Sequence, residues 1–299
     1  MLMQVPAQFE YEVADSVDEA ISLLQRHGPE SRLLAGGHSL IPMMKLRLAF
    51  PEVLIDIHKL DGELRYVREE GGVLKVGALA RRRDLLESPL VQERYTLLAD
   101  AEKFIADPLV RNMGTVGGSL AHADPAEDLP AAFVALGAEV VARGPQGERT
   151  VAVEDLSVGP FETVLEPDEI LTETRIPRAP QGSSYFKVER RAGDYASAAL
   201  GVALWMSGEE IEDVRVGMCS VGSTTLRARG AEEVLKGHSP DEELYKRAGE
   251  QAAEECDPPD DARGTPEYKR DLVRVLVVRA MEQAVGRARG AEDRTAQGR

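Results

Sequence analysis

Short apolar segments with the spacing of β-strands recur along the whole chain and alternate with stretches of helical period, and this alternation most constrains the fold. Residues 9–13, 32–35 and 53–57 are typical of three strands joined by crossovers, which predicts a small parallel βαβ unit. A capping box at Ser16–Glu19 starts the first intervening helix, and Gly28 is placed to end it. With 299 residues and no long linker, the chain is expected to form two or three packed units.

A second group of strand and helix candidates follows the first. Its strands are expected at residues 73–78, 138–142, 150–153 and 170–176, and its helices near residues 82–86, 97–105 and 126–136. This pattern predicts an α+β unit.

Pro177, Pro180 and Gly182 mark the next boundary. After it, three strands are expected at residues 184–188, 198–205 and 214–221, and they should form a three-stranded antiparallel sheet. A last helix, at residues 266–285, has an apolar face that should pack on this sheet. The predicted organisation is a first domain at residues 1–177 with subdomains at about 1–57 and 58–177, a C-terminal α+β domain at 178–286 and a flexible tail at 287–299.

Charge and hydropathy exclude several classes of protein. The chain has 52 acidic and 36 basic residues, a formal charge of -16, and no basic stripe that could follow a phosphate backbone, so no nucleic-acid partner is expected. No basic leader with an apolar run and no bilayer-length apolar segment is present, so we expect a cytoplasmic protein without a transmembrane segment.

The two cysteines, Cys219 and Cys256, are too few for the four thiolates of a [2Fe-2S] cluster, so any such cluster must belong to another subunit. The five histidines show neither metal-ligand spacing nor the order of a catalytic triad, and we predict no metal ligand and no catalytic residue. Asp124 and Glu127 are expected to solvate a helix start rather than bind a metal.

Two glycine-rich segments stand out, Ala35–Ser39 and Arg111–Ser119. Each contains a Gly-Gly pair followed, directly or after one residue, by a serine. Glycines admit positive φ and lack Cβ, so successive amides can turn inward and hold a diphosphate without any lysine or arginine. An isolated Gly-Gly pair more often makes only a tight turn, and neither segment matches the GxGxxG or GxxxxGKS signature.

Together these segments, AGGHSLIPMMKLRLAFPEVLIDI and RNMGTVGGSLAHADPAEDLP, resemble the flavoprotein subunits of the xanthine dehydrogenase and carbon monoxide dehydrogenase family. The similarity continues through TVLEPDEILTETRIP, KVERRAGDYASAALGVAL and DPPDDARGTPEYKRDLVRVLVVRA, so it spans nearly the whole chain in order. The resemblance implies an FAD-binding domain of the vanillyl-alcohol-oxidase (PCMH) type with two α+β subdomains, followed by a C-terminal α+β domain.

The resemblance also implies a set of FAD-binding residues. Main-chain amides of two runs should hold the pyrophosphate: Ala35, Gly36, Gly37, His38, Ser39 and Thr115, Val116, Gly117, Gly118, Ser119. Asp128 should bond the sugar-like portion of the cofactor, although its position equally suits the capping of a helix N-terminus. His38 stands where a glutamine is common in the family and Met113 where a basic residue is common, and neither change removes a glycine.

Four further residues are implied near the flavin ring. Ile105 and Leu171 resemble apolar residues that pack close to the flavin, whereas periodicity alone favours an ordinary core position for both. Lys187 resembles a lysine that approaches the ring, and its alternative is a solvated strand lysine. Tyr195 resembles an aromatic that shields one ring face, and its alternative is a buried sheet tyrosine. The two segments also place His38 and His122 near a ligand, where an ordinary loop histidine is the alternative.

The resulting hypothesis is an oxidoreductase subunit that carries electrons through FAD. Its implied partners are a small [2Fe-2S] subunit and a large molybdenum-cofactor subunit, assembled as a dimer of heterotrimers. One alternative is a stand-alone PCMH-type flavoprotein oxidase or reductase, which would need a substrate acid or base of its own. Another is a non-catalytic nucleotide-binding protein, which would carry no yellow chromophore. On this hypothesis the specificity for the oxidised substrate belongs to another polypeptide.

Overall fold

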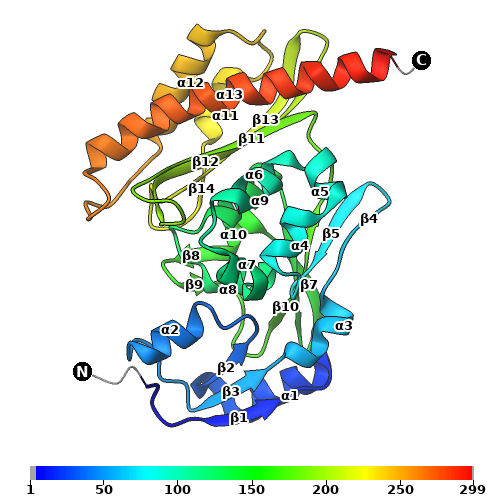
Figure 1. Ribbon diagram of the computed structural model, residues 1–299, viewed down its shortest axis with the longest axis vertical. Coiled ribbons are helices and arrows are strands. Elements are labelled where there is room, and N and C mark those ends of the chain that lie inside the picture. The colour runs from blue at the N-terminus through cyan, green and yellow to red at the C-terminus, as the bar shows by residue number, and fades with distance from the viewer. Residues whose placement is uncertain (1–4, 298–299) are drawn as a thin grey trace.

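The computed structural model describes residues 5–297, with side chains to residue 290. Three sheets are stacked along the long axis of the molecule, in the order in which they occur in the sequence (Figure 1). No helix within this range is long and apolar enough to span a bilayer.

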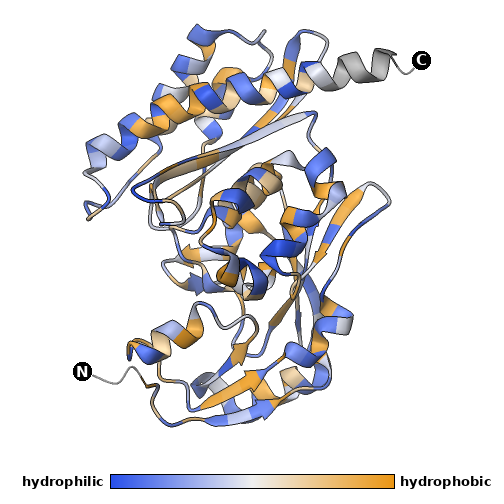
Figure 2. Cartoon of the chain, viewed as in Figure 1, coloured by the Kyte–Doolittle hydropathy of each residue, from blue (hydrophilic) through white to orange (hydrophobic). Residues whose placement is uncertain are grey.

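The N-terminal sheet has the order β1-β3-β2, and both pairs are parallel. Its strands are β1 (Glu10–Val13), β2 (Ser31–Leu34) and β3 (Val53–Asp56). Helix α1 (Val17–His27) begins as predicted, because Ser16 Oγ accepts from Glu19 N–H at 3.1 Å and Glu19 Oε2 accepts from Asp15 N–H at 2.8 Å. All four residues of β3 are buried, and Figure 2 shows this part of the sheet as strongly hydrophobic. The predicted parallel unit is confirmed.

Short helices connect this unit to the rest of the chain. They are η1 (Gly28–Glu30), α2 (Leu40–Lys45), η2 (His58–Leu60) and α3 (Asp61–Leu64).

The middle sheet has five strands in the order β4-β5-β10-β6-β7, all antiparallel. Its strands are β4 (Val67–Glu70), β5 (Val73–Gly77), β6 (Glu139–Gly144), β7 (Gly147–Ala152) and β10 (Ile170–Ile176). The helices of this unit are α4 (Arg82–Glu87), α5 (Pro89–Arg94), α6 (Thr96–Phe104), α7 (Pro108–Met113), α8 (Val116–His122), α9 (Asp128–Ala135) and α10 (Val153–Leu156). A small ribbon of β8 (Ser157–Gly159) and β9 (Glu162–Thr163) lies beside them.

The C-terminal sheet has four antiparallel strands, not the predicted three. Its strands are β11 (Gly182–Glu189), β12 (Ala196–Ser207), β13 (Glu210–Cys219) and β14 (Leu226–Arg227). The fourth strand escaped prediction because it has two residues, too few to show the alternation by which a strand is recognised. The outer face of the sheet is covered by α11 (Arg229–Leu235) and α13 (Pro266–Gln297), and α12 (Glu242–Glu254) packs on both of these helices. Figure 1 shows α13 crossing the sheet.

The last helix corrects the prediction of a flexible tail from residue 287. Helix α13 passes Val285 without ending and runs to Gln297. Ala288 is only 1% exposed, and Arg287 donates to the Ser183 carbonyl at 2.6 Å and to Asp100 of α6. These contacts fix the first residues of the stretch against β11 and α6, and polarity alone does not reveal them. Residues 298 and 299 of the predicted tail lie outside the described range.

The inner face of the C-terminal sheet packs on α6 and α9 of the middle unit. Gly217 of β13 makes this approach possible, because a Cβ there would lie 2.1 Å from the Ala131 carbonyl oxygen of α9. We expect Gly217→Ala to lower the free energy of unfolding by about 1–3 kcal/mol, because the obstructing atom is backbone and cannot rotate away. Urea unfolding measures the change. Gly286→Ala is the control, since nothing lies within 4 Å and the helix should tolerate or gain from alanine. Equal losses from both substitutions would contradict the packing argument.

Candidate functional site

A cavity of about 1030 Å³ is lined by residues of all three sheets and their connections. Its size is at the upper end of the range for small-molecule sites, about 300–1,000 Å³. Fourteen of the fifteen residues predicted for the cofactor line it, and Val116, which is fully buried, does not. The fourteen are Ala35, Gly36, Gly37, His38, Ser39, Ile105, Thr115, Gly117, Gly118, Ser119, Asp128, Leu171, Lys187 and Tyr195.

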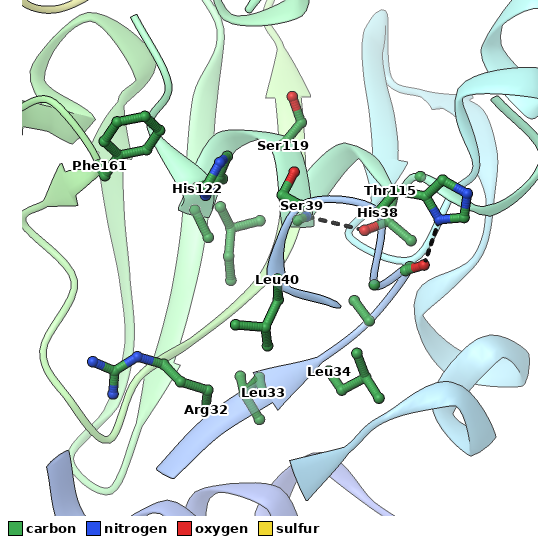
Figure 3. Close-up of a pocket in the computed structure, with 18 of the residues that line it drawn as sticks. Arg32, Leu33, Leu34, His38, Ser39, Leu40, Thr115, Ser119, His122 and Phe161 are labelled. Atoms are coloured by element: carbon green, nitrogen blue, oxygen red, sulfur yellow. Dashed lines mark hydrogen bonds between the residues drawn. The ribbon is translucent and has the colours of Figure 1, made fainter. Parts of the chain in front are cut away.

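The first glycine segment follows β2 and leads into α2. Gly37 has a φ of 73°, a conformation that favours glycine, and the turn is completed by a bond from Ile41 N–H to the Gly37 carbonyl at 3.1 Å. Among the described residues, no acceptor is bonded to the amides at residues 36–39. His38 Nδ1 lies 3.0 Å from the Gly36 carbonyl, the contact drawn in Figure 3. Four main-chain donors on this wall of the cavity therefore have no partner among the described residues, as an anion site requires.

The second glycine segment differs from the expected loop, because Thr115 is the N-cap of helix α8 and the glycines lie in its first turn. The amides of Val116 and Gly117 donate to Ala80 and Ala78 carbonyls at 2.9 and 2.8 Å. The Gly118 amide donates to Thr115 Oγ1 at 3.1 Å. These three amides are already bonded within the protein, so they are not the free, inward-turned donors that the sequence suggested. Neither Gly117 nor Gly118 has a positive φ.

Close approach is what requires glycine in this region. A Cβ on Gly117 would lie 2.6 Å from Ala78 Cβ, and one on Gly36 would lie 2.2 Å from the Met113 carbonyl oxygen. A Cβ on Gly118 would lie 4.0 Å from Ala35 Cβ, so the two glycine segments touch each other. Figure 3 shows Ser39, Thr115 and Ser119 gathered at this junction. The two segments that the sequence singled out therefore meet at the wall of one cavity, and the amides without a partner belong to the first of them.

Asp128 and Lys187 form a buried ion pair beside the cavity. Lys187 Nζ lies 3.0 Å from Asp128 Oδ2 and 3.2 Å from Glu189 Oε2, and its side chain is 1% exposed. Tyr185 donates its hydroxyl to Asp128 Oδ1 at 2.7 Å. Burial raises the pKa of Asp128, and Lys187 opposes that rise. Lys187 is therefore not the solvated lysine of the alternative interpretation, and Asp128 bonds other side chains rather than capping a helix.

The apolar candidates lie on the walls of the cavity. Ile105 ends α6, Leu171 lies in β10, and each is 6% exposed, so both belong to the core as well as to the cavity wall. Tyr195 lies in the turn before β12 and is 45% exposed, which excludes the buried sheet tyrosine. His122 is the last residue of α8, and its ring centroid lies 5.1 Å from that of Phe161. Figure 3 draws both side chains among those that line the cavity.

Sequence reasoning missed a buried charged group behind the second segment. Arg82 donates to Ser119 Oγ at 2.9 Å and lies 3.5 Å from Glu127 and 3.8 Å from Glu102. Glu127, expected to solvate a helix start, is instead bonded to Ser119. Burial raises the pKa of Glu102 to about 8 and that of Glu127 to about 7. The only available signal was the run of arginines at residues 81–83, which a solvated helix start also explains.

The raised pKa of Glu102 predicts a pH-dependent stability. The folded chain binds a proton between the unfolded value of 4.5 and about 8, so this contribution is present below pH 4.5 and is lost as the pH rises through about 8. We expect Glu102→Gln to reduce the stability lost between pH 5 and pH 8.5 by about 1–3 kcal/mol, measured by urea unfolding at each pH. Glu87→Gln, an exposed partner of Arg83, is the control and should change the loss by less than about 0.5 kcal/mol. Parallel profiles for wild type and Glu102→Gln would show that Glu102 does not retain its proton.

The comparisons with known proteins agree with this geometry. Residues 7–179 match the FAD binding domain in molybdopterin dehydrogenase, and residues 183–284 match the CO dehydrogenase flavoprotein C-terminal domain. The chain is 43% identical over 285 residues to the carbon monoxide dehydrogenase medium chain of Hydrogenophaga pseudoflava, covering 95% of this chain and 99% of that one. The corresponding chain of Afipia carboxidovorans is 40% identical over 287 residues, with 95% and 99% covered.

A solved structure of carbon monoxide dehydrogenase from Hydrogenophaga pseudoflava, lacking the Mo-pyranopterin moiety of its cofactor, superimposes with a TM-score of 0.92 at 44% identity. That superposition covers 95% of this chain and 99% of the other. The chain therefore belongs to the family of FAD-binding medium subunits of the carbon monoxide dehydrogenase and xanthine dehydrogenase type of molybdenum hydroxylase.

Proposed function

We propose that this medium subunit accepts electrons from [2Fe-2S] clusters on a small partner subunit and passes them to an external acceptor. The clusters in turn are reduced by a molybdenum cofactor on a large partner subunit. Two such heterotrimers form the complete assembly. The observation that carries the proposal is a single cavity that combines four free main-chain donors at one segment with a buried lysine at another. When bound, FAD supplies a centre that accepts single electrons and releases a pair.

The residues present fit FAD. The amides at residues 36–39 suit a pyrophosphate, because they can neutralise an anion without a basic side chain. Thr115 and Ser119 add hydroxyl groups beside them. Ile105, Leu171 and Tyr195 supply apolar and aromatic wall for a planar ring, and Lys187 supplies positive charge close to it. Asp128 keeps Lys187 in place and offers acceptor oxygens to cofactor hydroxyls.

The same proposal assigns part of the FAD site to each unit of the chain. The subdomains at about 1–57 and 58–177 and the C-terminal domain at 178–286 each contribute cavity residues. Gly36–Ser39 come from the first, Ile105 and Leu171 from the second, and Lys187 and Tyr195 from the third. The chain has no cluster ligands, since its two cysteines are both buried in separate places. On this proposal, the clusters that deliver electrons to the cavity belong to a partner chain.

Purification of the tagged full-length chain from the cells that encode it tests this proposal. We expect two further polypeptides, one large and one small, to copurify with iron, molybdenum and flavin in the complex. The visible spectrum should show flavin bands overlapping those of iron and sulfur. A monomer that carries flavin and oxidises a substrate unaided would overturn the proposal, and a colourless chain in the intact assembly would overturn the role of FAD.

A further inference from the structure

Arg82 is a buried cation that faces two buried carboxyl groups. Its side chain is 6% exposed; Nη1 lies 3.8 Å from Glu102 Oε1 and Nη2 lies 3.5 Å from Glu127 Oε2. Nη2 also donates to Ser119 Oγ at 2.9 Å. Arg82 and Glu127 line the FAD cavity, whereas Glu102 lies behind them with none of its side chain exposed.

The hydrogen bonds of this group are incomplete. Both carboxyl oxygens of Glu102 and Nη1 of Arg82 have no hydrogen-bond partner within the part of the chain that the structure describes. A carboxylate hydrogen-bonded to a guanidinium lies at about 2.7–2.9 Å, so the 3.8 Å separation is a charge contact without a bond. An ionised carboxylate that is buried without hydrogen bonds is costly, which favours a proton on Glu102.

Neighbouring buried acids increase the cost of ionising Glu102, and two arginines oppose them. The ionisable groups whose charges act on Glu102 come from the elements around it: Arg82 of α4, Arg111 of α7, Glu127 before α9 and Asp128 of α9. Lys187 of β11 forms ion pairs with Asp128 and Glu189. Counting Arg82, Arg111 and Lys187 against Glu102, Glu127, Asp128 and Glu189 gives three cations and four acids, so full ionisation would leave one excess negative charge around a buried carboxyl group. Raised pKa values for Glu102 and Glu127 agree with this count.

We propose that Glu102 and Glu127, held apart by Arg82, store a proton whose binding is coupled to the charge on FAD in the adjoining cavity. This inference rests on the proposed function, which delivers the electrons. Two electrons and one proton entering FAD add one net negative charge. Further proton uptake from water, through Glu127 on the cavity wall, raises the average protonation of the carboxyl pair and offsets part of that charge. Arg82 is a positioning residue that keeps the two carboxyl groups on opposite sides of one cation.

The magnitude is measurable. One added charge at about 10 Å, with an effective dielectric constant of about 20, shifts the pKa of a carboxyl by about one unit. Near pH 8 such a shift corresponds to uptake of about half a proton per electron pair, beyond the uptake by FAD itself.

Redox potentiometry of the flavin in the assembled complex, repeated from pH 6 to pH 9.5, tests the proposal. The slope against pH gives the protons taken up per electron pair. We expect wild type to exceed Glu102→Gln by about half a proton near pH 8. Glutamine keeps the shape of the protonated side chain, so the variant should fold and bind FAD. Reduced-minus-oxidised infrared spectra should also contain a carboxyl C=O band that Glu102→Gln loses.

Glu87→Gln, on the exposed face of α4, is the matched control and should follow wild type. If FAD is bound and reduced in both proteins but the slopes and carboxyl bands of wild type and Glu102→Gln coincide, proton storage is refuted while the electron-transfer function stands. If the complex contains no reducible flavin, the proposed function fails and this inference fails with it.

Discussion

Gly36→Ala should weaken FAD binding by about 10- to 100-fold in the assembled complex. The new Cβ would lie 2.2 Å from the Met113 carbonyl oxygen and 2.9 Å from its carbon, and both atoms are backbone. The clash can be relieved only by moving the free amides at residues 36–39 away from the second glycine segment. The flavin content of purified complex and the dissociation constant on reconstitution with FAD measure the effect.

Gly62→Ala provides the control for this substitution. It lies in α3, has no positive φ, and nothing lies within 4 Å of a Cβ built there. It should leave both FAD affinity and thermal unfolding close to wild type. Unchanged FAD affinity in Gly36→Ala would show that the contact between the glycine segments does not shape the pyrophosphate site.

Lys187→Met should lower the free energy of unfolding by about 3–5 kcal/mol at neutral pH. Asp128, which is only 6% exposed, would then be left as a buried acid without its cation. Without Lys187 the folded-state pKa of Asp128 should rise further above the unfolded value of 3.8, so the deficit should grow as the pH rises and shrink toward pH 5. Urea unfolding of the full chain at pH 5 and pH 8 measures this.

The double variant Lys187→Met/Asp128→Asn separates the charge effect from the loss of packing. Asparagine is neutral and can still accept from the Tyr185 hydroxyl, so most of the lost stability should return. A double variant as unstable as Lys187→Met alone would assign the loss to packing rather than to an unpaired acid.

The sequence predicted the elements whose patterns are local. Strand β3 is apolar except for its last residue, β10 is rich in β-branched residues, and the N-cap at Ser16 is a short-range motif. β4, with the sequence VREE, was missed because its charges hide the alternation. α8 was read as a loop because Gly117 and Gly118 disfavour a helix, but the Thr115 cap and packing against Ala78 outweigh that preference.

Some features of the candidate site could likewise be predicted from the sequence and others could not. Its glycines could be found because close backbone approach leaves a residue-type signature, and resemblance supplied the isolated residues Lys187 and Tyr195. The partners of those residues could not be read from sequence, because the Lys187–Asp128 pair joins positions 59 apart in the chain. Both carboxyl oxygens of Glu102 are buried without a hydrogen-bond partner among the described residues, a property that arises from tertiary packing and leaves no pattern in the sequence.

The cavity is lined by residues far apart in the sequence, so these residues are synthesised at different times. The first donors, at residues 36–39, leave the ribosome long before Lys187 and Tyr195, and α13 follows later still. Since domains generally fold as units during synthesis, the N-terminal half emerges with only part of the pocket in place. On the proposed function, the flavin meets its complete set of wall residues only after synthesis has passed Tyr195.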